Sequence, residues 1–202
     1  MHSRGMSKFP TLFLAVAVNN ACAGFVASAG LEPLLRPGSA ASDEVTALPG
    51  WAGALPSRQY SGYLPVGDGT RHLHYYFTES EASPSADPVT LWLNGGPGAS
   101  SIAYGMMTEI GQLVFNRDSL AANTTAVPAL QYNRYGWSTF TNMLYLESPV
   151  GVGFSYCENP PCRSNDTSTA TDSFDALTGF FQRFPAFSGR KFYITGESSH
   201  GP

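Results

Sequence analysis

The chain has 202 residues, enough for one domain with a sizeable hydrophobic core, and its formal net charge at pH 7 is −4. Only 13% of the residues are charged and no run of Lys or Arg is present, which argues against a nucleic acid as partner. The 13 Phe and 10 Tyr indicate an aromatic-rich folded interior and exclude a disordered chain.

The first 23 residues have the pattern of a secretory signal peptide. Arg4 and Lys8 precede an apolar run at residues 9–18, and residues 21–23 (Ala-Cys-Ala) form a small-x-small cleavage signal. A short buried helix or a membrane anchor is the alternative, but the run is much shorter than the roughly 20 residues that span a bilayer. We therefore expect no membrane span and entry into the secretory pathway, with an extracellular or a vacuolar or lysosomal destination.

Residues 24–47 are rich in Ala, Ser and Pro and show no periodicity, which is typical of a flexible, propeptide-like leader. We expect the order to begin near Leu48, so that residues 48–202 form the folded domain. Cleavage of the signal peptide would leave Cys157 and Cys162. An even number of cysteines in a secreted chain favours a disulfide between them, and two unrelated thiols are the alternative.

Two triplets match the acceptor pattern for N-glycosylation. They begin at Asn123 and Asn165, both in polar, loop-like stretches, and they fit the same compartment as the disulfide. Such triplets also arise by chance.

Most of the secondary structure predicted along the chain consists of β-strands. Residues 59–66 and 73–77 are rich in β-formers and flank Gly-Asp-Gly-Thr, which predicts a β-hairpin. Continuous apolar runs without alternation are typical of strands that are buried on both faces. They occur at residues 89–93, 143–146 and 192–194.

One helix is predicted between the last two of these strands, at residues 171–184. Asp172 and Asp175 are interpreted as charges in its first turn, where they favour the helix dipole, and Pro185 ends it. Its aromatic stripe is interpreted as core packing. The stripe consists of Phe174, Leu177, Phe180, Phe181 and Phe184. A hairpin followed by strand, helix and strand predicts an α/β fold, with a mostly parallel sheet and helices on both faces.

Two of the predicted strands end in turns that hold candidate catalytic residues. Residues 94–98 (Asn-Gly-Gly-Pro-Gly) follow the first central strand, and glycines there leave N–H groups uncovered for an oxyanion site. Gly196-Glu197-Ser198 follows the last strand, as a nucleophile elbow does. The alternative for residues 94–98 is a plain Gly-Pro turn, and the alternative for Ser198 is a solvated serine. Because two such turns follow two strands of one chain, the functional interpretation is favoured.

Three longer strings contain these turns and closely resemble the motifs of the serine carboxypeptidases (carboxypeptidase Y- and cathepsin A-like), which are secreted or vacuolar/lysosomal α/β-hydrolases. The strings are Trp92-Leu-Asn-Gly-Gly-Pro-Gly98, Asn142-Met-Leu-Tyr-Leu-Glu-Ser-Pro-Val-Gly-Val-Gly-Phe-Ser-Tyr156 and Tyr193-Ile-Thr-Gly-Glu-Ser198, with supporting matches at residues 60–64, 109–111, 132–133 and 136–137. The resemblance covers about residues 48–198. It implies the N-terminal part of an α/β-hydrolase that releases C-terminal amino acids from peptides through an acyl-enzyme, with no cofactor and no metal.

The resemblance also implies a role for each site residue. Ser198 would be the nucleophile, and the backbone N–H groups of Gly96 and Ser199 would form the oxyanion hole. The free C-terminal carboxylate of a peptide or protein substrate would be bound by four further residues. These are Asn94, Gly95 through its N–H, Glu109 and Glu197. Acidic residues bind a carboxylate only when they are protonated, so such an enzyme should prefer acid pH.

The chain departs from the family pattern at a few positions. Ala99 stands where the family usually has Cys, and His200 stands where a small residue lets strand and helix pack closely. His200 is also too near Ser198 in sequence to act as its base. His72 and His74 lie on a predicted strand and are interpreted as surface or hairpin residues.

The chain ends at Pro202, whereas hydrolases of this type place the catalytic acid and then the base after the nucleophile. We therefore expect a fragment of a serine carboxypeptidase that lacks the Asp and His, and we expect the 202-residue chain to be inactive. A truncated, inactive secreted product is the alternative, as is an acyltransferase relative that uses the same fold.

Overall fold

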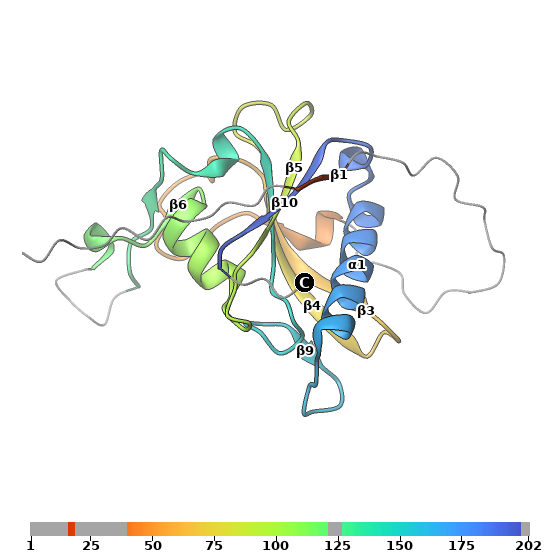
Figure 1. Cartoon of the computed structure of the whole chain (residues 1–202). Helices are drawn as coiled ribbons and strands as arrows, with labels where there is room; N and C mark the ends of the chain where they lie inside the picture. Colours follow the sequence, from red (N-terminus) through yellow and green to blue (C-terminus); the bar gives the residue numbers. More distant parts are fainter. Residues whose placement is uncertain (1–15, 19–39, 121–126, 199–202) are drawn as a thin grey trace, which may run out of the picture.

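The computed structural model describes residues 16–18, 40–120 and 127–198 (Figure 1). Of the expected signal peptide, only the backbone of β1 (Val16–Val18) lies within these residues, and it pairs antiparallel with β10 (Phe192–Gly196). The rest of the signal peptide, its cleavage site and most of the leader lie outside the described residues.

Regular structure begins earlier than expected. The 3₁₀ helix η1 (Ala40–Asp43) and strand β2 (Glu44–Val45) precede Leu48, and β2 pairs antiparallel with β3 (Gln59–Val66). Asp43 holds this segment in place because its Oδ2 accepts hydrogen bonds of 2.6 Å from Tyr75 Oη and of 2.6 Å from Arg183 Nη1. The prediction that order begins near Leu48 is therefore wrong. The contacts of Asp43 with Tyr75 and Arg183 fix part of the polar segment that was predicted to be a flexible leader.

The described residues form one eight-stranded sheet and a separate pair of short strands. The order along the large sheet is β1-β10-β5-β8-β4-β3-β2, with β9 also paired to β4. Its remaining strands are β4 (Arg71–Thr78), β5 (Val89–Leu93), β8 (Asn142–Leu146) and β9 (Tyr156–Cys157), and the separate pair is β6 (Leu113–Val114) with β7 (Gln131–Tyr132).

The sheet is mixed. Its parallel part consists of β10, β5 and β8, the three strands that were predicted from continuous apolar runs. The other pairs in the described sheet are antiparallel, because the predicted hairpin β3–β4 adds to β8 through an antiparallel β4–β8 contact. The α/β class holds, and the parallel arrangement is confined to the centre of this part of the fold.

Alternate residues of the central strands face two separate cores. Leu91, Leu144 and Leu146 belong to a core with helix α1 (Asp166–Arg183), which contributes Ala176 and Phe180. Their neighbours Trp92, Met143 and Tyr145 belong to a second core with Ile102 and Met106 of η2 (Ser101–Ile110), a π-helical segment. Helices therefore cover both faces, α1 on one side and η2 on the other (Figure 1).

Helix α1 starts at Asp166 rather than at residue 171, and this changes the role of two aspartates. Asp172 lies inside the helix, is buried, and has its Oδ1 2.7 Å from Arg71 Nη2 of the hairpin. Asp175 Oδ2 accepts a hydrogen bond of 2.9 Å from the N–H of Gly67. The interpretation of both as first-turn charges is wrong, because they bind the hairpin that lies under the helix.

The aromatic stripe of α1 is only partly core. Phe180 is fully buried and Phe184, just after the helix, is 4% exposed, but Phe174 is 69% exposed. The expected core role therefore fails for Phe174. The helix ends at Arg183 before Pro185, as predicted, and Pro185 opens the 3₁₀ helix η5 (Pro185–Phe187). Two further 3₁₀ helices are η3 (Arg117–Ser119) and η4 (Trp137–Thr139).

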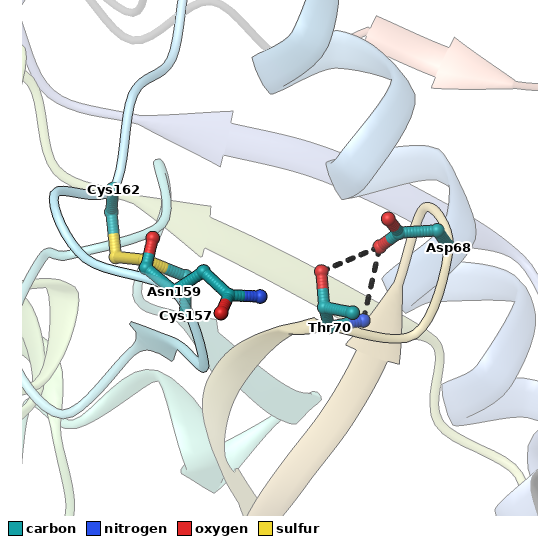
Figure 2. The surroundings of a disulfide bond; sticks show 5 residues. All are labelled: Asp68, Thr70, Cys157, Asn159 and Cys162. Carbon is teal, nitrogen blue, oxygen red and sulfur yellow. Dashed lines mark hydrogen bonds between the residues drawn. A yellow bond between two sulfur atoms is a disulfide. The ribbon is translucent and has the colours of Figure 1, made fainter.

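The loop after β9 contains a disulfide between Cys157 and Cys162 (Figure 2). It lies beside the hairpin turn, in which Asp68 Oδ1 accepts hydrogen bonds from the N–H of Thr70 at 3.0 Å and from its hydroxyl at 2.7 Å. The N–H of Glu158 donates to the carbonyl of Thr70 at 2.9 Å. The disulfide thus closes a loop that is attached to the outer end of the hairpin. None of the helices in the described residues is long and apolar enough to cross a membrane.

Candidate active site

Ser198 lies in a strained turn directly after β10. Its φ is +62°, and it is the only residue other than glycine with positive φ in the described part of the chain. A side-chain-bearing residue in this left-handed region is uncommon, and such strain concentrates at functional sites. It is the backbone conformation that a nucleophile elbow requires, because the sharp turn after the strand exposes the serine hydroxyl. Ser198 is exposed accordingly.

The cradle loop, which we define as residues 94–98, lies beside Ser198. The loop follows β5, which pairs in parallel with β10, with Leu93 opposite Gly196. The N–H of Glu197 donates to the carbonyl of Leu93 at 3.2 Å, so the two chains stay paired up to the start of both turns. Because the carboxyl ends of parallel strands meet at one edge of the sheet, the cradle loop and Ser198 share a site.

Asn94 is fixed in one orientation at the start of the cradle loop. Its Oδ1 accepts hydrogen bonds from Trp92 Nε1 at 2.7 Å and from the N–H of Gly105 at 3.1 Å. Its N–H donates to Ser101 Oγ at 3.0 Å. Since the amide oxygen is used by these two donors, the Nδ2 group is directed to the other side, where it donates to Glu197 Oε2 at 3.3 Å. Asn94 therefore presents a donor toward the edge that carries Ser198.

The two glycines after Asn94 shape the turn. Gly96 has a φ of +123°, and a Cβ atom there would lie 2.9 Å from the N–H nitrogen of Gly98. The carbonyl of Gly95 accepts a hydrogen bond of 3.0 Å from the N–H of Ala99, which closes the turn. Gly95 is buried, whereas Gly96 is exposed. Only a residue without a side chain fits at position 96, and it leaves the backbone open to a bound molecule.

Two carboxyl groups meet at this edge. Glu109 comes from η2 and Glu197 from the turn after β10. The pKa of Glu109 is raised, first by desolvation, then by the charge of Glu197 and by a hydrogen bond between the two side chains. The negative charge of a nearby carboxylate disfavours ionisation of Glu109, which is why its pKa rises beside Glu197. Glu109 can therefore donate a hydrogen bond at a pH at which an isolated carboxyl would already be ionised.

Asn133 was assigned no role from the sequence, yet it holds the end of η2. Its Nδ2 donates to the carbonyls of Glu109 at 3.0 Å and of Gly111 at 3.1 Å. The only signal in the sequence was its place in the Tyr132-Asn133 match. Glu147 was likewise given no role, although a buried carboxyl directly after an apolar strand is itself a signal. Glu147 is 1% exposed and accepts a hydrogen bond from Ser100, two residues after the cradle loop.

The structure thus brings six of the predicted site residues to one edge of the sheet. They are Asn94, Gly95, Gly96, Glu109, Glu197 and Ser198. Cys157, Cys162 and Asn165 lie elsewhere, in or after the disulfide loop. Asn123, Ser199 and His200 fall outside the described residues. Within residues 40–120 and 127–198, no group of His, Cys, Asp and Glu side chains is arranged to hold a metal ion.

His72 and His74 both lie on β4 of the hairpin, as expected from the sequence. Of the two expected places, surface or hairpin, His74 occupies the hairpin and not the surface, because its side chain is only 7% exposed. It is buried because its two ring nitrogens have polar partners, Glu147 Oε2 at 3.1 Å and Ser61 Oγ at 2.9 Å. A histidine with both nitrogens bonded is tolerated in a core.

A comparison with protein families finds the serine carboxypeptidases, whose sequence model matches residues 49–201. The chain belongs to the serine carboxypeptidase family. Serine carboxypeptidase 1 of Hordeum vulgare is 49% identical over 160 residues, which is 78% of this chain and 31% of the barley protein. The lysosomal protective protein of Mus musculus is 45% identical over 159 residues, 79% of this chain and 31% of the mouse protein. The chain therefore spans about a third of the length of these curated relatives.

A solved structure with a similar backbone is that of Kex1Δp, a prohormone-processing carboxypeptidase from Saccharomyces cerevisiae. The TM-score is 0.63 at 23% sequence identity, over 76% of this chain and 35% of the yeast chain. This likeness concerns the fold alone, and it confirms the predicted α/β-hydrolase fold over the part that the chain spans. The motifs at residues 92–98, 142–156 and 193–198 therefore identified the family correctly from the sequence.

Proposed function

We propose that this chain forms the nucleophile, oxyanion and carboxylate-binding part of a serine-type carboxypeptidase, a hydrolase that releases C-terminal amino acids from peptides. One observation carries the proposal. Ser198, in its left-handed turn, follows directly on Glu197, which bonds to Asn94 and shares a hydrogen bond with Glu109. A nucleophile next to a protonated carboxyl pair suits a substrate whose scissile bond is adjacent to a free carboxylate.

Ser198 is the proposed nucleophile. Its Oγ attacks the last peptide carbonyl, the C–N bond breaks, and the C-terminal amino acid leaves with a proton on its amine. Water then attacks the acyl-serine ester, which restores the Ser198 hydroxyl and releases the shortened peptide as an acid. The N–H groups of Gly96 and Ser199 are proposed to stabilise the oxyanion in both steps.

The free carboxylate of the substrate is proposed to bind to the donors at the same edge. These are Asn94 Nδ2, the N–H of Gly95 and the shared proton of Glu109 and Glu197. Trp92 and Gly105 occupy the Asn94 oxygen, which leaves its NH₂ group to face the carboxylate. Because the pKa of Glu109 is raised, the proton on the pair survives to higher pH than on a lone carboxyl, and binding is strongest under acid conditions.

The described histidines are not proposed as the base for Ser198. His74 is buried against Glu147, and His72 Nε2 lies 3.3 Å from Glu158 Oε1 at the hairpin end. The general base and its acid partner are proposed to belong to the part of the family fold that these residues do not span. The disulfide between Cys157 and Cys162 and the triplets at Asn123 and Asn165 support a proposed site of action in the secretory pathway, outside the cell or in a vacuole or lysosome.

A chimera tests the proposed function. Residues 49–198 replace the matched segment of barley serine carboxypeptidase 1, which supplies the rest of the fold. We expect it to cleave a blocked dipeptide with a free C-terminus at acid pH and to leave the C-terminally amidated analogue almost untouched. Ser198→Ala should lower kcat at least about a thousandfold, since loss of the nucleophile leaves only residual catalysis. Ser164→Ala, at an exposed serine before α1, is the matched control and should leave kcat unchanged.

Two outcomes would overturn the proposal. A chimera that folds, as judged by circular dichroism and a cooperative unfolding transition, but shows no turnover would exclude the assigned roles. Equal cleavage of the free and amidated substrates would exclude carboxylate recognition. The second result would move an acyl-transfer activity of the same fold ahead of a carboxypeptidase.

A further inference from the structure

A buried acid and base lie just behind the cradle loop. Glu147 follows β8 directly and His74 comes from the neighbouring strand β4, and they are 1% and 7% exposed. Glu147 Oε2 lies 3.1 Å from His74 Nδ1 and accepts a hydrogen bond of 2.8 Å from the N–H of Phe154. His74 Nε2 lies 2.9 Å from Ser61 Oγ. Burying a carboxyl and an imidazole side by side costs desolvation, which the hydrogen bonds around both groups offset.

The second carboxylate oxygen of Glu147 reaches the cradle. Glu147 Oε1 accepts a short hydrogen bond from the hydroxyl of Ser100, two residues after the end of the cradle loop. Ser100 is also the N-cap of η2, and its Oγ accepts a hydrogen bond of 2.9 Å from the N–H of Ala103. A hydroxyl can donate and accept at once, so Ser100 connects the buried Glu147 to the first turn of η2. That segment carries Glu109 at its other end.

The cradle loop is therefore anchored on both sides. At its start, Asn94 is held by Trp92, Gly105 and Ser101. Beyond its end, the hydroxyl of Ser100 donates a hydrogen bond to Glu147 and holds the chain there. The residues between these anchors include Gly96 and Gly98, which have no side chain to restrict their backbone. The position of the Gly96 N–H thus depends on the two anchors.

The surrounding chain is built around the Glu147 side chain. A Cβ atom at Gly153 would lie 1.9 Å from Glu147 Oε1, so only glycine fits there. Ser155 Oγ donates to the carbonyl of Glu147 at 2.6 Å and accepts from the N–H of His74 at 2.8 Å. Burial by itself raises the pKa of Glu147, but the hydrogen bonds from His74, Phe154 and Ser100 outweigh it and lower the pKa overall. The pKa of Glu147 is thus lowered while that of Glu109 is raised, so Glu147 stays an acceptor at a more acid pH than Glu109 does.

We propose that Glu147, supported by His74, is a positioning residue that holds the cradle loop in its working geometry through the hydroxyl of Ser100. Glu147 touches neither the substrate nor the reacting atoms in this assignment. It acts on the oxyanion donor at Gly96 and on the carboxylate donors at Asn94 and Gly95 by restricting the loop that carries them. The inference rests on the proposed carboxypeptidase activity for its kinetic consequence, but the restriction of the loop is independent of that activity.

Two measurements on matched variants test the inference. Glu147→Gln removes the charge of the acceptor and Ser100→Ala removes the donor of the same contact. Glu158→Gln is the control, because Glu158 is 57% exposed and pairs with His72 instead. Hydrogen exchange of peptides that cover residues 94–106 is followed in the full chain and in the chimera. Values of kcat/KM are measured in the chimera for both single variants and for the double variant, well below the unfolding temperature.

We expect Glu147→Gln and Ser100→Ala each to speed exchange of residues 94–106 and to lower kcat/KM by about tenfold, the scale of one lost charge-assisted hydrogen bond. The double variant should lose no more than the worse single variant, because both changes break one connection. Glu158→Gln should change neither quantity.

The result that overturns the inference is a double variant whose losses multiply, or loop exchange that matches that of the unsubstituted chain. Either would reduce Glu147 to a packing role. If the unsubstituted chimera is folded but inactive, the proposed function fails, and exchange of residues 94–106 alone then decides whether Glu147 positions the loop.

Discussion

Asn94 Nδ2 donates a hydrogen bond of 3.3 Å to Glu197 Oε2, and this bond joins the ends of two neighbouring parallel strands, β5 and β10. The two residues are 103 positions apart in the sequence. Their contact places an amide donor and a carboxyl group next to Ser198, and Glu109 adds a second carboxyl from η2. Each side chain is ordinary by itself, and together they form the proposed carboxylate site beside the proposed nucleophile.

The first prediction concerns pH. Above its raised pKa Glu109 loses its proton, and its negative charge beside Glu197 then repels the substrate carboxylate, so KM should rise with pH. Glu197→Gln cannot ionise, and its amide still donates a hydrogen bond. In the chimera we expect kcat/KM of this variant to stay within a few-fold of the unsubstituted protein at about pH 4, and to fall less steeply toward about pH 7.

Glu158→Gln is the control for this profile, because it makes the same chemical change at an exposed carboxyl that pairs with His72. Its profile should follow that of the unsubstituted chimera. Superimposable profiles for Glu197→Gln and the unsubstituted chimera at every pH would show that the pair does not bind the substrate carboxylate.

The second prediction concerns Gly105, which packs against Asn94 and Trp92. A Cβ atom at Gly105 would lie 2.2 Å from Trp92 Nε1 and 2.8 Å from Asn94 Oδ1, so both side chains would have to move. Gly105→Ala should therefore raise KM for a free-acid substrate at least about tenfold, the scale of one misplaced donor to a charged group. The control is Gly179→Ala in α1, where the added methyl meets only Leu64 Cδ2 at 3.6 Å. A KM for Gly105→Ala equal to that of this control would contradict the geometry.

The sequence predicted the centre of the fold well because the signal there is local. The hairpin and the strand at residues 89–93 were read correctly from β-formers, turn residues and uninterrupted apolar runs. The start of α1 was misjudged because Asn165 and Ser168 form a capping box in a polar stretch without an apolar stripe. The ordered residues 40–45 were missed because Asp43 is held by Tyr75 and Arg183, partners that are remote in sequence.

The site residues also fall into two groups: those with a local signature in the sequence and those defined by contacts between remote residues. Motifs pointed to residues 94–98 and 196–198, because glycine-rich turns after buried strands have a local signature. The role of Asn133 depends on the carbonyls of Glu109 and Gly111, and that of Glu147 depends on Ser100 and His74. These contacts join separate elements, so no spacing along the chain reveals them. Buried polar side chains inside a recognised motif were the available clue.

The third prediction concerns the disulfide. Cys157 and Cys162 close a short loop whose first residue belongs to β9, and β9 pairs with Arg71 and His72 of the hairpin. Replacing both cysteines by serine should lower the free energy of unfolding of the chimera by about 2 kcal/mol, the loop-closure value for so short a loop. Urea unfolding measures this. Activity should change little, because the hydrogen bonds of this loop go to Thr70 and His72 of the hairpin, and a large loss of kcat without a loss of stability would contradict that expectation.

The last prediction separates two uses of Asn165. Its Oδ1 accepts a hydrogen bond of 2.9 Å from the N–H of Ser168, so it caps α1, and its Nδ2 is the atom that a glycan would modify. In the chimera secreted from a eukaryotic host, Asn165→Asp and Thr167→Ala should each abolish the glycan but keep the cap. Asn165→Ala should abolish both. Only Asn165→Ala should lose about 1 kcal/mol in the free energy of unfolding of the enzymatically deglycosylated proteins, the usual cost of a missing cap. Mass spectrometry and urea unfolding give the two readouts. Equal stability of Asn165→Ala and Asn165→Asp would show that the cap contributes nothing, and an unmodified Asn165 in the unsubstituted protein would refute the glycan.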